Sequence, residues 1–257
     1  MDSWISLEHE TAGDDAKPVF DEKTLNEKLR ILVAVPLTHR KNYGINWLSE
    51  DRPPLQRKKP MNLPTLILAS ASPRRLELLR QTGLEFQAIP SNADEIHNEQ
   101  LTAAELSQIN AYRKARAVSK KFPDALVIAM DTLVASGSKL FGKPQNIAEA
   151  GRMLEELQGR THEVVTGGCL IHLRSHRQRV FADRTRVTFR SLNAAEIARY
   201  HSKINPLDKA GAYAIQEHGD DIVRNISGSF SNVVGLPLEL LSEELAQFET
   251  RAPSVFA

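Results

Sequence analysis

The sequence contains little cysteine and no long apolar run. Its single cysteine, Cys169, excludes an internal disulfide and a metal cluster built on cysteine ligands. One unpaired thiol is typical of a reducing compartment, so we expect a cytoplasmic protein. No apolar stretch approaches the roughly 20 residues that cross a bilayer, and the first ten residues are too polar for a signal peptide. We therefore expect no membrane partner.

The chain also lacks an excess of charge of either sign. It has 33 lysines and arginines against 32 aspartates and glutamates, a formal net charge of +1. Such a balance creates no global field that would attract nucleic acid or anionic lipid, so nucleic acid is not an expected partner. Any basic binding site must be local. Hydrophobic content of 41% and charged content of 25% are typical of globular proteins.

Several familiar active-site motifs are missing. No Gly-x-x-x-x-Gly-Lys-Ser/Thr sequence is present, which excludes a P-loop. The stretch Gly228-Ser-Phe-Ser-Asn232 lacks the second glycine of a nucleophile elbow. The eight histidines have no paired ligand spacing, and His162 is expected to be structural. The chemistry must therefore come from other residues.

The composition divides the chain into two parts, residues 1–60 and 61–257. The stretch Arg52–Pro60 is rich in proline and basic residues, as a solvated linker is. Before it, only Leu29–Val35 is apolar, and such a segment is too short to form its own core. We predict an unstructured extension over 1–60 and a folded domain over 61–257; docking of the apolar segment on that domain is the alternative.

From residue 61 onward, strand patterns alternate with helix patterns. This alternation predicts an α/β protein, and the hairpins among the strands predict a mixed sheet. Capping motifs at Thr102, Asn146 and Asn193 predict the starts of three helices. The expected strands are 65–69, 86–89, 125–130, 164–173, 179–189 and 221–226, with a hairpin over 133–141, a loop over 206–216 that enters a short strand, a turn over 228–232 and a closing helix over 236–248.

The stretch Thr65–Arg75 organises the rest of the domain. It reads as a buried strand, a tight turn and a helix that begins with Ser72 as N-cap and Pro73 at the first position. A helix N-terminus attracts anions, and the hydroxyl of Ser70 and the guanidinium of Arg74 add donors suited to phosphate. Arg75 could add a second guanidinium. A phosphate site and an ordinary turn with solvated arginines are equally compatible with this spacing.

Three further residues could carry chemistry. Asp131 follows the most apolar strand, where an aspartate can bind Mg²⁺ or accept a proton from water, or merely cap a turn. Lys143 lies in Phe-Gly-Lys-Pro, and Lys114 lies in the middle of a helix. Each lysine is either an anion ligand or a solvated surface residue.

The order of short motifs along the chain goes beyond these separate alternatives. It resembles the Maf family of nucleoside triphosphate pyrophosphatases over about residues 63–245. The motifs that carry the resemblance are Ser70-Ala-Ser-Pro-Arg-Arg75, Ser91-Asn-Ala-Asp-Glu95, Lys114-Ala115, Ala129-Met-Asp-Thr132, Gly142-Lys-Pro144, Gly159-Arg-Thr-His162, Thr166-Gly167, Asp208-Lys-Ala-Gly-Ala-Tyr213, Ile215-Gln216 and Ser231-Asn-Val-Val-Gly-Leu-Pro237.

The resemblance implies a fold like that of the Maf and inosine-triphosphatase proteins, an elongated mixed sheet with flanking helices and two lobes around a cleft. It implies hydrolysis of a nucleoside triphosphate to the monophosphate and pyrophosphate with a divalent metal, Mg²⁺ or Mn²⁺. Asp131 matches the proton acceptor of the family, and Asp94 matches an acidic residue near the metal, so Asp94 and Asp131 are the expected metal residues. Arg74, Lys114 and Lys143 match triphosphate ligands.

The resemblance also suggests a substrate and leaves open questions. Thr132 and Gln216 look like the branch that acts on dTTP and UTP, and modified pyrimidine nucleotides could fit the same site. Glu217-His218-Gly219 replaces a glycine-richer stretch of the family pattern, so the loop around the base differs. The alternative function is a non-catalytic nucleotide-binding regulator of cell division or septation. A homodimer is an open possibility that the sequence does not decide.

Overall fold

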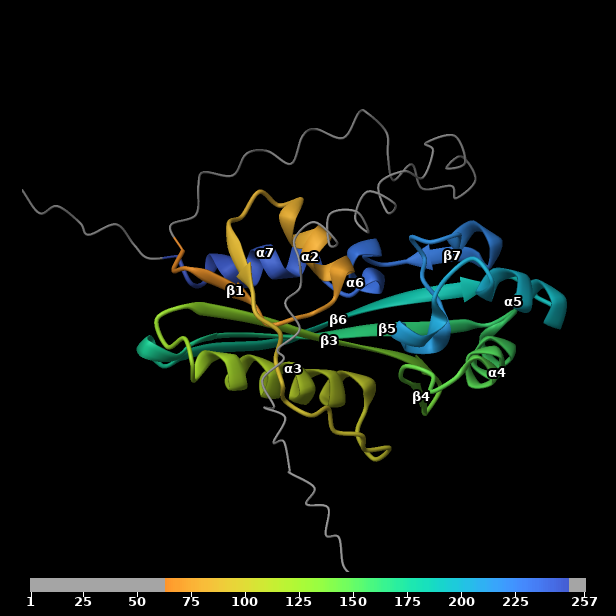
Figure 1. Ribbon diagram of the computed structural model, residues 1–257, viewed down its shortest axis with the longest axis horizontal. Coiled ribbons are helices and arrows are strands. Elements are labelled where there is room, and N and C mark those ends of the chain that lie inside the picture. The colour runs from red at the N-terminus through yellow and green to blue at the C-terminus, as the bar shows by residue number, and fades with distance from the viewer. Residues whose placement is uncertain (1–62, 250–257) are drawn as a thin grey trace, which may run out of the picture. The chain divides into compact units, whose positions relative to one another are not determined.

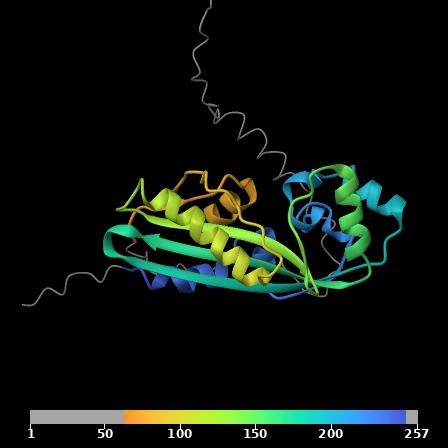
Figure 2. The same cartoon turned by 90° about the horizontal axis from the view of Figure 1, so that it is seen from below.

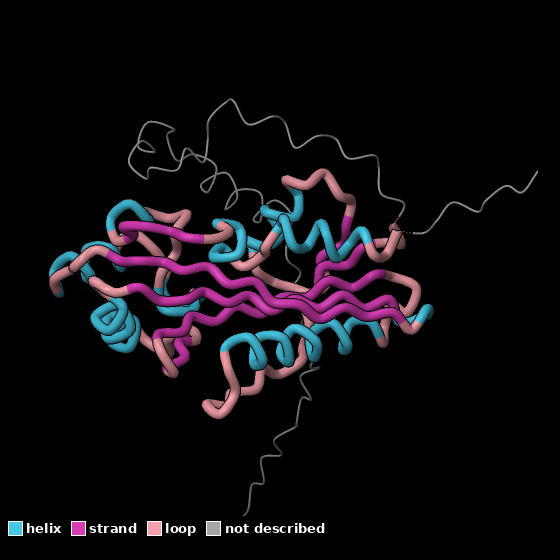
Figure 3. Tube along the Cα trace, turned by 180° about the vertical axis from the view of Figure 1, so that it is seen from behind, coloured by secondary structure: helices cyan, strands magenta, loops and turns pink. Residues whose placement is uncertain are grey.

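The computed structural model describes residues 63–249, which form one mixed sheet with helices on both faces (Figures 1 and 3). Within this part of the chain the strand order is β2-β1-β3-β5-β6-β7, and β4 pairs with β3. The predicted α/β class is therefore confirmed. The strands are β1 Leu66–Leu68, β2 Phe86–Ala88, β3 Leu126–Ser136, β4 Lys139–Phe141, β5 Thr161–His172, β6 Arg177–Phe189 and β7 Val223–Ser227.

The sheet is parallel at one side and antiparallel at the other. Helices α2 (Pro73–Arg80) and α3 (Ala103–Ser119) return the chain so that β1 pairs in parallel with both β2 and β3. From β3 onward the pairs β3–β4, β3–β5, β5–β6 and β6–β7 are antiparallel. The helical crossovers that place β1, β2 and β3 in parallel and the β3–β4 and β5–β6 hairpins together make the sheet mixed.

Alternating residues of β1 feed two cores on opposite faces of the sheet. Ile67 belongs to a core with Ala111 and Ala115 of α3, whereas Leu66 belongs to a core with Leu79 of α2 and Leu241 of α7 (Leu238–Ala246). Figure 1 shows α3 on one side of the strands and α2 and α7 on the other. Period-two alternation of a strand covered on both faces produces this arrangement.

A second group of helices lies at the other end of the long strands (Figures 1 and 2). It contains α4 (Ile147–Leu157), α5 (Ala194–His201) and the short 3-10 helices η3 (Pro206–Asp208) and η4 (Ala210–Ala212). Asn146 and Asn193 cap α4 and α5, as predicted. The two groups of helices at the two ends of the sheet correspond to the two expected lobes.

The structure corrects the predicted end of the strand before Asp131. The strand predicted to end on Asp131 and Thr132 continues to Ser136 as β3, which pairs with β5 as far as Ala135 and includes the first arm of the hairpin predicted over 133–141. The residues after Asp131 remain in the strand because they are mostly apolar and largely buried. The other neighbour of β3, strand β1, is shorter and pairs with it only as far as Ile128. Asp131 thus lies in mid-strand, just beyond the end of β1.

Other predicted boundaries also change. Residues 206–216 form η3 and η4 and contain no strand, because Gly211 and Ala212 have φ values of +69° and +62°, which an extended strand does not allow. The strand expected from residue 221 begins at Val223, after a further 3-10 helix, η5 (Gly219–Asp221). The turn predicted over 228–232 runs into a short helix, α6 (Phe230–Val234).

Two further predictions concern the extension and membrane-crossing helices. The predicted extension 1–60 lies outside the described residues and stays a prediction. Among the helices of residues 63–249, none has both the length and the apolar character that a membrane crossing requires.

Candidate active site

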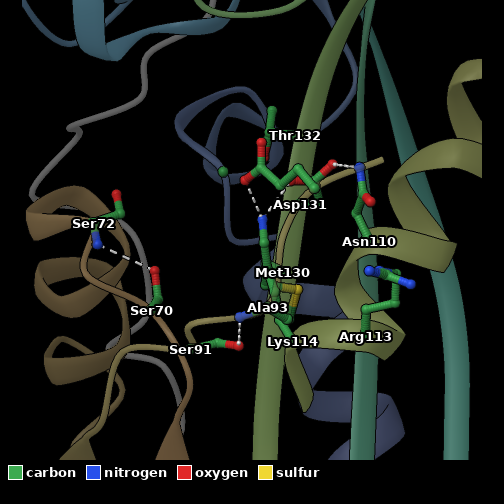
Figure 4. A network of polar contacts seen from close by, with 12 residues as sticks. Ser70, Ser72, Ser91, Ala93, Asn110, Arg113, Lys114, Met130, Asp131 and Thr132 are labelled. Carbon is green, nitrogen blue, oxygen red and sulfur yellow. Dashed lines mark hydrogen bonds and ion pairs between the residues drawn. The ribbon is translucent and has the colours of Figure 1, made fainter. Parts of the chain in front are cut away.

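Asp131 is a buried carboxylate in the middle of the sheet, and only 5% of its surface is exposed. Lys114 of α3 donates a hydrogen bond from Nζ to Oδ1 of Asp131 over 2.6 Å. Asn110, one helical turn earlier, donates from Nδ2 to Oδ2 over 3.3 Å. Figure 4 shows both side chains directed at Asp131. Residues four apart share one helix face, so α3 contacts both oxygens of this carboxylate.

Glu95 joins this group from the loop before α3. Its Oε1 accepts a second hydrogen bond from Lys114 Nζ, also over 2.6 Å. Burial would raise the pKa of Glu95, but the hydrogen bond and charge of Lys114, with the charges of Lys143 and Arg75, outweigh it and hold that pKa below its ordinary value. We call Asp131, Lys114, Asn110 and Glu95 the carboxylate centre.

Asn110 also holds the loop that carries Glu95. Its Oδ1 accepts from Ile96 N over 2.9 Å, and its Nδ2 donates to Ile96 O over 3.2 Å. Nearby, Arg113 Nε donates to the carbonyl oxygen of Asp94 over 3.2 Å. The loop is therefore fixed through its backbone, while the Asp94 side chain is exposed.

Gly167 brings α3 close to the sheet beside the carboxylate centre. It lies opposite Asp131 in the pairing of β3 with β5. A Cβ atom at this position would come within 2.4 Å of the backbone of Ser107 and Gln108 in α3. Backbone atoms cannot move aside as a flexible side chain can, so this approach requires glycine. It sets the distance over which Asn110 and Lys114 reach Asp131.

Arg75 is a structural clamp around Asp131. Its guanidinium donates to Met130 O over 3.0 Å, to Thr132 Oγ1 over 2.9 Å and to Gly235 O over 2.8 Å. Burial lowers its pKa, with the charge of Asp131 acting in the opposite direction. Each of the three guanidinium nitrogens donates once to the fold, which uses three of its five N–H groups, and the role of Arg75 as a second guanidinium for phosphate stays a prediction.

The turn before α2 differs in detail from its predicted form. Ser72 occupies the N-cap, but its side chain makes no capping hydrogen bond. Instead, Ser70 Oγ accepts from Ser72 N over 3.1 Å (Figure 4). Arg74 projects from the first turn of α2 and donates to Oδ2 and the carbonyl oxygen of Asp208, over 3.3 and 3.2 Å. This contact links α2 to η3.

Lys143 is exposed, in the loop after β4. The preceding residue, Gly142, accepts a hydrogen bond at its carbonyl from Gly211 N over 3.0 Å, which ties the loop to η4. The charge of Lys143 contributes to the lowered pKa of Glu95, so it acts on the carboxylate centre through space.

Residues 206–217, which we call the Gln216 segment, are held by buried aromatic side chains. Tyr200 of α5 donates to Ala214 O and accepts from Ala214 N, both over 3.0 Å. Tyr213 packs edge-on against Phe189 and His162, and its hydroxyl lies 2.8 Å from His162 Nε2. Burial lowers the pKa of His162 to about 4. His162 is thus structural, as predicted.

Thr132 and Gln216, the residues that resemble the dTTP/UTP branch, make different kinds of contact. Thr132 Oγ1 accepts from Arg75 and lies 3.0 Å from Thr166 Oγ1, so this hydroxyl belongs to a side-chain network. Gln216 is half-buried, and its Nε2 donates to Glu217 Oε1 over 3.3 Å. Thr132 adjoins the carboxylate centre, whereas Gln216 belongs to the other group of helices.

The donor set is compatible with a divalent metal bound together with a phosphate ligand. Glu95 and Asp131 converge on Lys114 Nζ, and carboxylate oxygens are the ligands that Mg²⁺ prefers. Within residues 63–249 no group of three or more His, Cys, Asp or Glu side chains could hold a metal ion by itself. Mg²⁺ commonly uses one or two carboxylates and completes its shell with substrate phosphates and water, so this arrangement fits it.

Some site residues lie together and some do not. Asp131 and Lys114 are in direct contact, Thr132 follows Asp131 in the strand, and the charge of Lys143 acts on the neighbouring Glu95. Arg74 and Ser70 lie at the start of α2. Asn110 is a site residue that the sequence motifs did not predict, and Glu95 is the acid that contacts Lys114, while the expected role of Asp94 at a metal stays a prediction. The spacing of Asn110 and Lys114, four residues apart on one helix, was an available signal.

Comparison with known proteins identifies relatives of this chain. The family model described as Maf-like protein matches residues 65–248. The dTTP/UTP pyrophosphatase of Gloeobacter violaceus is 47% identical over 186 residues, which are 72% of this chain and 97% of that protein. The dTTP/UTP pyrophosphatase of Bacillus cereus is 42% identical over 192 residues, 75% of this chain and 94% of that protein.

Among solved structures, the chain is similar to the Ham1 protein of Staphylococcus aureus, with a TM-score of 0.43 and 15% identity over 71% of this chain and 98% of that one. The family assignment depends instead on the family model and on the curated relatives, since this chain covers nearly the whole length of each relative. The chain belongs to the Maf family.

Proposed function

We propose that this chain is a nucleoside triphosphate pyrophosphatase that hydrolyses dTTP and UTP to the monophosphate and pyrophosphate. The observation that carries the proposal is the contact of the buried Asp131 with Lys114 in a member of the Maf family, with Glu95 on the same ammonium. Relatives that this chain covers almost completely bear the name dTTP/UTP pyrophosphatase.

The reaction requires a base, and Asp131 is the residue that we assign to it. Its carboxylate accepts a proton from a water molecule, whose oxygen attacks the α-phosphorus. The bond from that phosphorus to its bridging oxygen breaks, and the electron pair leaves with pyrophosphate. Lys114 and Asn110 hold the carboxylate in place, since each donates to one of its oxygens.

The triphosphate needs positive charge and hydrogen-bond donors around it. Arg74, Lys114 and Lys143 are the cations that we assign to it, together with the Ser70 hydroxyl at the start of α2. Their charges offset the negative charge that develops on the leaving pyrophosphate. Arg74 contacts Asp208, so we propose that a phosphate oxygen replaces this carboxylate when the nucleotide binds.

A divalent metal is part of the proposal. We assign Asp131 and Asp94 to Mg²⁺ or Mn²⁺, with Glu95, which converges with Asp131 on Lys114, as the alternative to Asp94. Substrate phosphates and water would complete the shell, and the metal would neutralise phosphate charge and polarise the phosphoryl group. For the base, Gln216 offers one acceptor and two donors, which suit the O4 and N3–H edge of uracil or thymine. We assign Thr132 to the same selectivity, next to Asp131.

The setting of the enzyme is part of this proposal as well. We propose a cytoplasmic location, which the unpaired Cys169 supports. The partner is the nucleotide itself, and modified pyrimidine nucleotides are further candidate substrates. A homodimer stays a prediction.

The test is a panel of nucleotides assayed with Mg²⁺ or Mn²⁺ for pyrophosphate release. We expect dTTP and UTP to be hydrolysed much faster than ATP and GTP. Release of orthophosphate in place of pyrophosphate would indicate a different hydrolase. Binding of nucleotide without turnover would favour the non-catalytic regulator of cell division. Omission of the metal, with a chelator present, tests the metal requirement.

A further inference from the structure

Gln216 has a neighbour that restricts how its amide can point. Nε2 of Gln216 donates to Oε1 of Glu217 over 3.3 Å. An ionised carboxylate accepts hydrogen bonds and donates none. Rotation of the amide by 180° would place Gln216 Oε1 against Glu217 Oε1, two acceptors facing each other. Glu217 therefore selects one of the two amide orientations.

Glu217 is itself held from the buried side. The Nζ atom of Lys209 lies 3.4 Å from Glu217 Oε2, and only 4% of Lys209 is exposed. The same ammonium donates to Asn205 O over 2.8 Å and to Asp208 Oδ1 over 2.7 Å. A buried ammonium is costly without anionic partners, so Lys209 keeps the Glu217 carboxylate turned toward it. The other oxygen of Glu217 remains on Gln216.

The fixed amide leaves Gln216 with a defined pattern of hydrogen-bonding groups. Besides the N–H bonded to Glu217, the amide has its Oε1 acceptor and a second N–H donor, which a base could engage. Uracil and thymine present a donor at N3 and an acceptor at O4, whereas cytosine presents an acceptor at N3 and a donor at N4. With the sugar and triphosphate holding the ring in one place, one amide orientation matches uracil and thymine, and the opposite orientation matches cytosine.

We propose that Glu217, held by Lys209, is a positioning residue that fixes the Gln216 amide so that the site accepts uracil and thymine and rejects cytosine. The inference depends on the proposed function, in which Gln216 contacts the base. The Gln216–Glu217 hydrogen bond carries it, and the anchoring of Glu217 by a buried lysine makes it specific to one orientation.

The experiment compares kcat/KM for UTP and CTP in the wild type, Glu217→Gln and Glu217→Ala. In Glu217→Gln, the new amide pairs with Gln216 in either orientation; in Glu217→Ala, the partner is absent. The control is Asp220→Asn, which removes an exposed acid from the same region. UTP and CTP share the triphosphate and sugar, so a loss of folded enzyme or of general catalysis cancels in their ratio.

We expect both Glu217 variants to narrow the UTP/CTP ratio by about tenfold, a factor that corresponds to ~1.4 kcal/mol. Activity on CTP should rise while activity on UTP falls, and Asp220→Asn should keep the wild-type ratio. For a variant too slow to assay, the dissociation constants of UMP and CMP provide the ratio.

Two outcomes would overturn the inference while leaving the pyrophosphatase intact: an unchanged ratio in both Glu217 variants, or a wild type that hydrolyses CTP as well as UTP. A wild type that releases no pyrophosphate from either nucleotide would instead overturn the proposed function. The two failures are therefore distinguishable in one set of assays.

Discussion

The carboxylate centre and the Gln216 segment are held in place by different kinds of structure. Asp131 lies on a long strand, and Asn110 and Lys114 reach it from one face of a 17-residue helix. The Gln216 segment consists of short 3-10 helices with two residues at positive φ. Strand and helix fix the first group through backbone hydrogen bonds, whereas the second depends on side chains such as Tyr200, His162 and Lys209.

The difference indicates which property each region controls. A group that performs chemistry must be held within a fraction of an ångström, and regular elements provide that rigidity. Loops on a rigid scaffold can change without disturbing the sheet, which suits residues that select a substrate. We therefore expect variants of the carboxylate centre to change the rate for every nucleotide, and variants of the Gln216 segment to change the preference among them.

The largest effect is expected from Asp131→Asn. This change removes the negative charge of the base but keeps the volume and an oxygen that accepts from Lys114. Loss of general-base catalysis typically costs roughly 10²–10⁴-fold in rate, and we expect that loss in kcat for UTP and dTTP alike. Pyrophosphate release measures it, with Asp124→Asn at a surface ion pair as the control. Turnover close to that of the wild type would make Asp131 a structural residue.

The next effect concerns stability and the anchoring of the Gln216 segment. The pKa of His162 is lowered from 6.5 to about 4 by burial, so the unfolded chain binds a proton in a pH range where the folded chain does not. The stabilisation is complete above pH 6.5 and is lost as pH falls through about 4. The loss in the free energy of unfolding is up to about 3 kcal/mol.

Urea unfolding at a series of pH values measures this linkage. We expect His162→Phe, which keeps an aromatic ring but cannot titrate, to weaken the pH dependence between 6.5 and 4. The exposed His176→Asn is the matched control, because asparagine tolerates its left-handed backbone. Equal slopes in His162→Phe and the wild type would remove His162 as the source.

A smaller effect is expected from Gln216→Glu. This change replaces the amide donors with a carboxylate beside Glu217 and leaves the O4 acceptor of the base unpaired. A buried hydrogen bond lost in this way costs about 1–3 kcal/mol, or roughly 5- to 150-fold in kcat/KM for UTP. Steady-state kinetics against the surface variant Gln178→Glu tests it. A purine preference of the wild type would contradict the assignment of Gln216 to the base.

The smallest effect is expected from deletion of residues 1–60. The family match begins at residue 65. The hydrogen bonds that define the carboxylate centre and the Gln216 segment have both partners within residues 63–249. We expect unchanged pyrophosphate release and a melting temperature within a few degrees of that of the full chain. Aggregation, or a much lower melting temperature, would show that the extension is part of the core.

Much of the fold follows from local patterns in the sequence. Capping residues located the starts of α3, α4 and α5, because a cap is a contact within three residues. The end of β3 was missed, since its continuation depends on pairing with β5, about 30 residues further along the chain. The helical turns over 206–212 were missed because the positive φ of Ala212 has no sequence signal.

The site was predictable to a similar extent. Asp131 and Lys114 were named from motifs, but their contact follows from the packing of α3 on the sheet, which no motif records. Arg75 and Arg74 are adjacent in sequence, yet one is enclosed by β3 and Gly235 while the other reaches Asp208. Only the direction of each side chain from α2 separates these two roles.

Gly167 carries a consequence for any search for essential residues in this chain. It has no functional group, so a survey of titratable and polar side chains would pass over it. Yet even one methyl group there would meet the backbone of α3, the helix from which Asn110 and Lys114 reach Asp131. In a saturation screen for loss of activity, we expect position 167 to tolerate as few replacements as position 131, through the space it leaves empty.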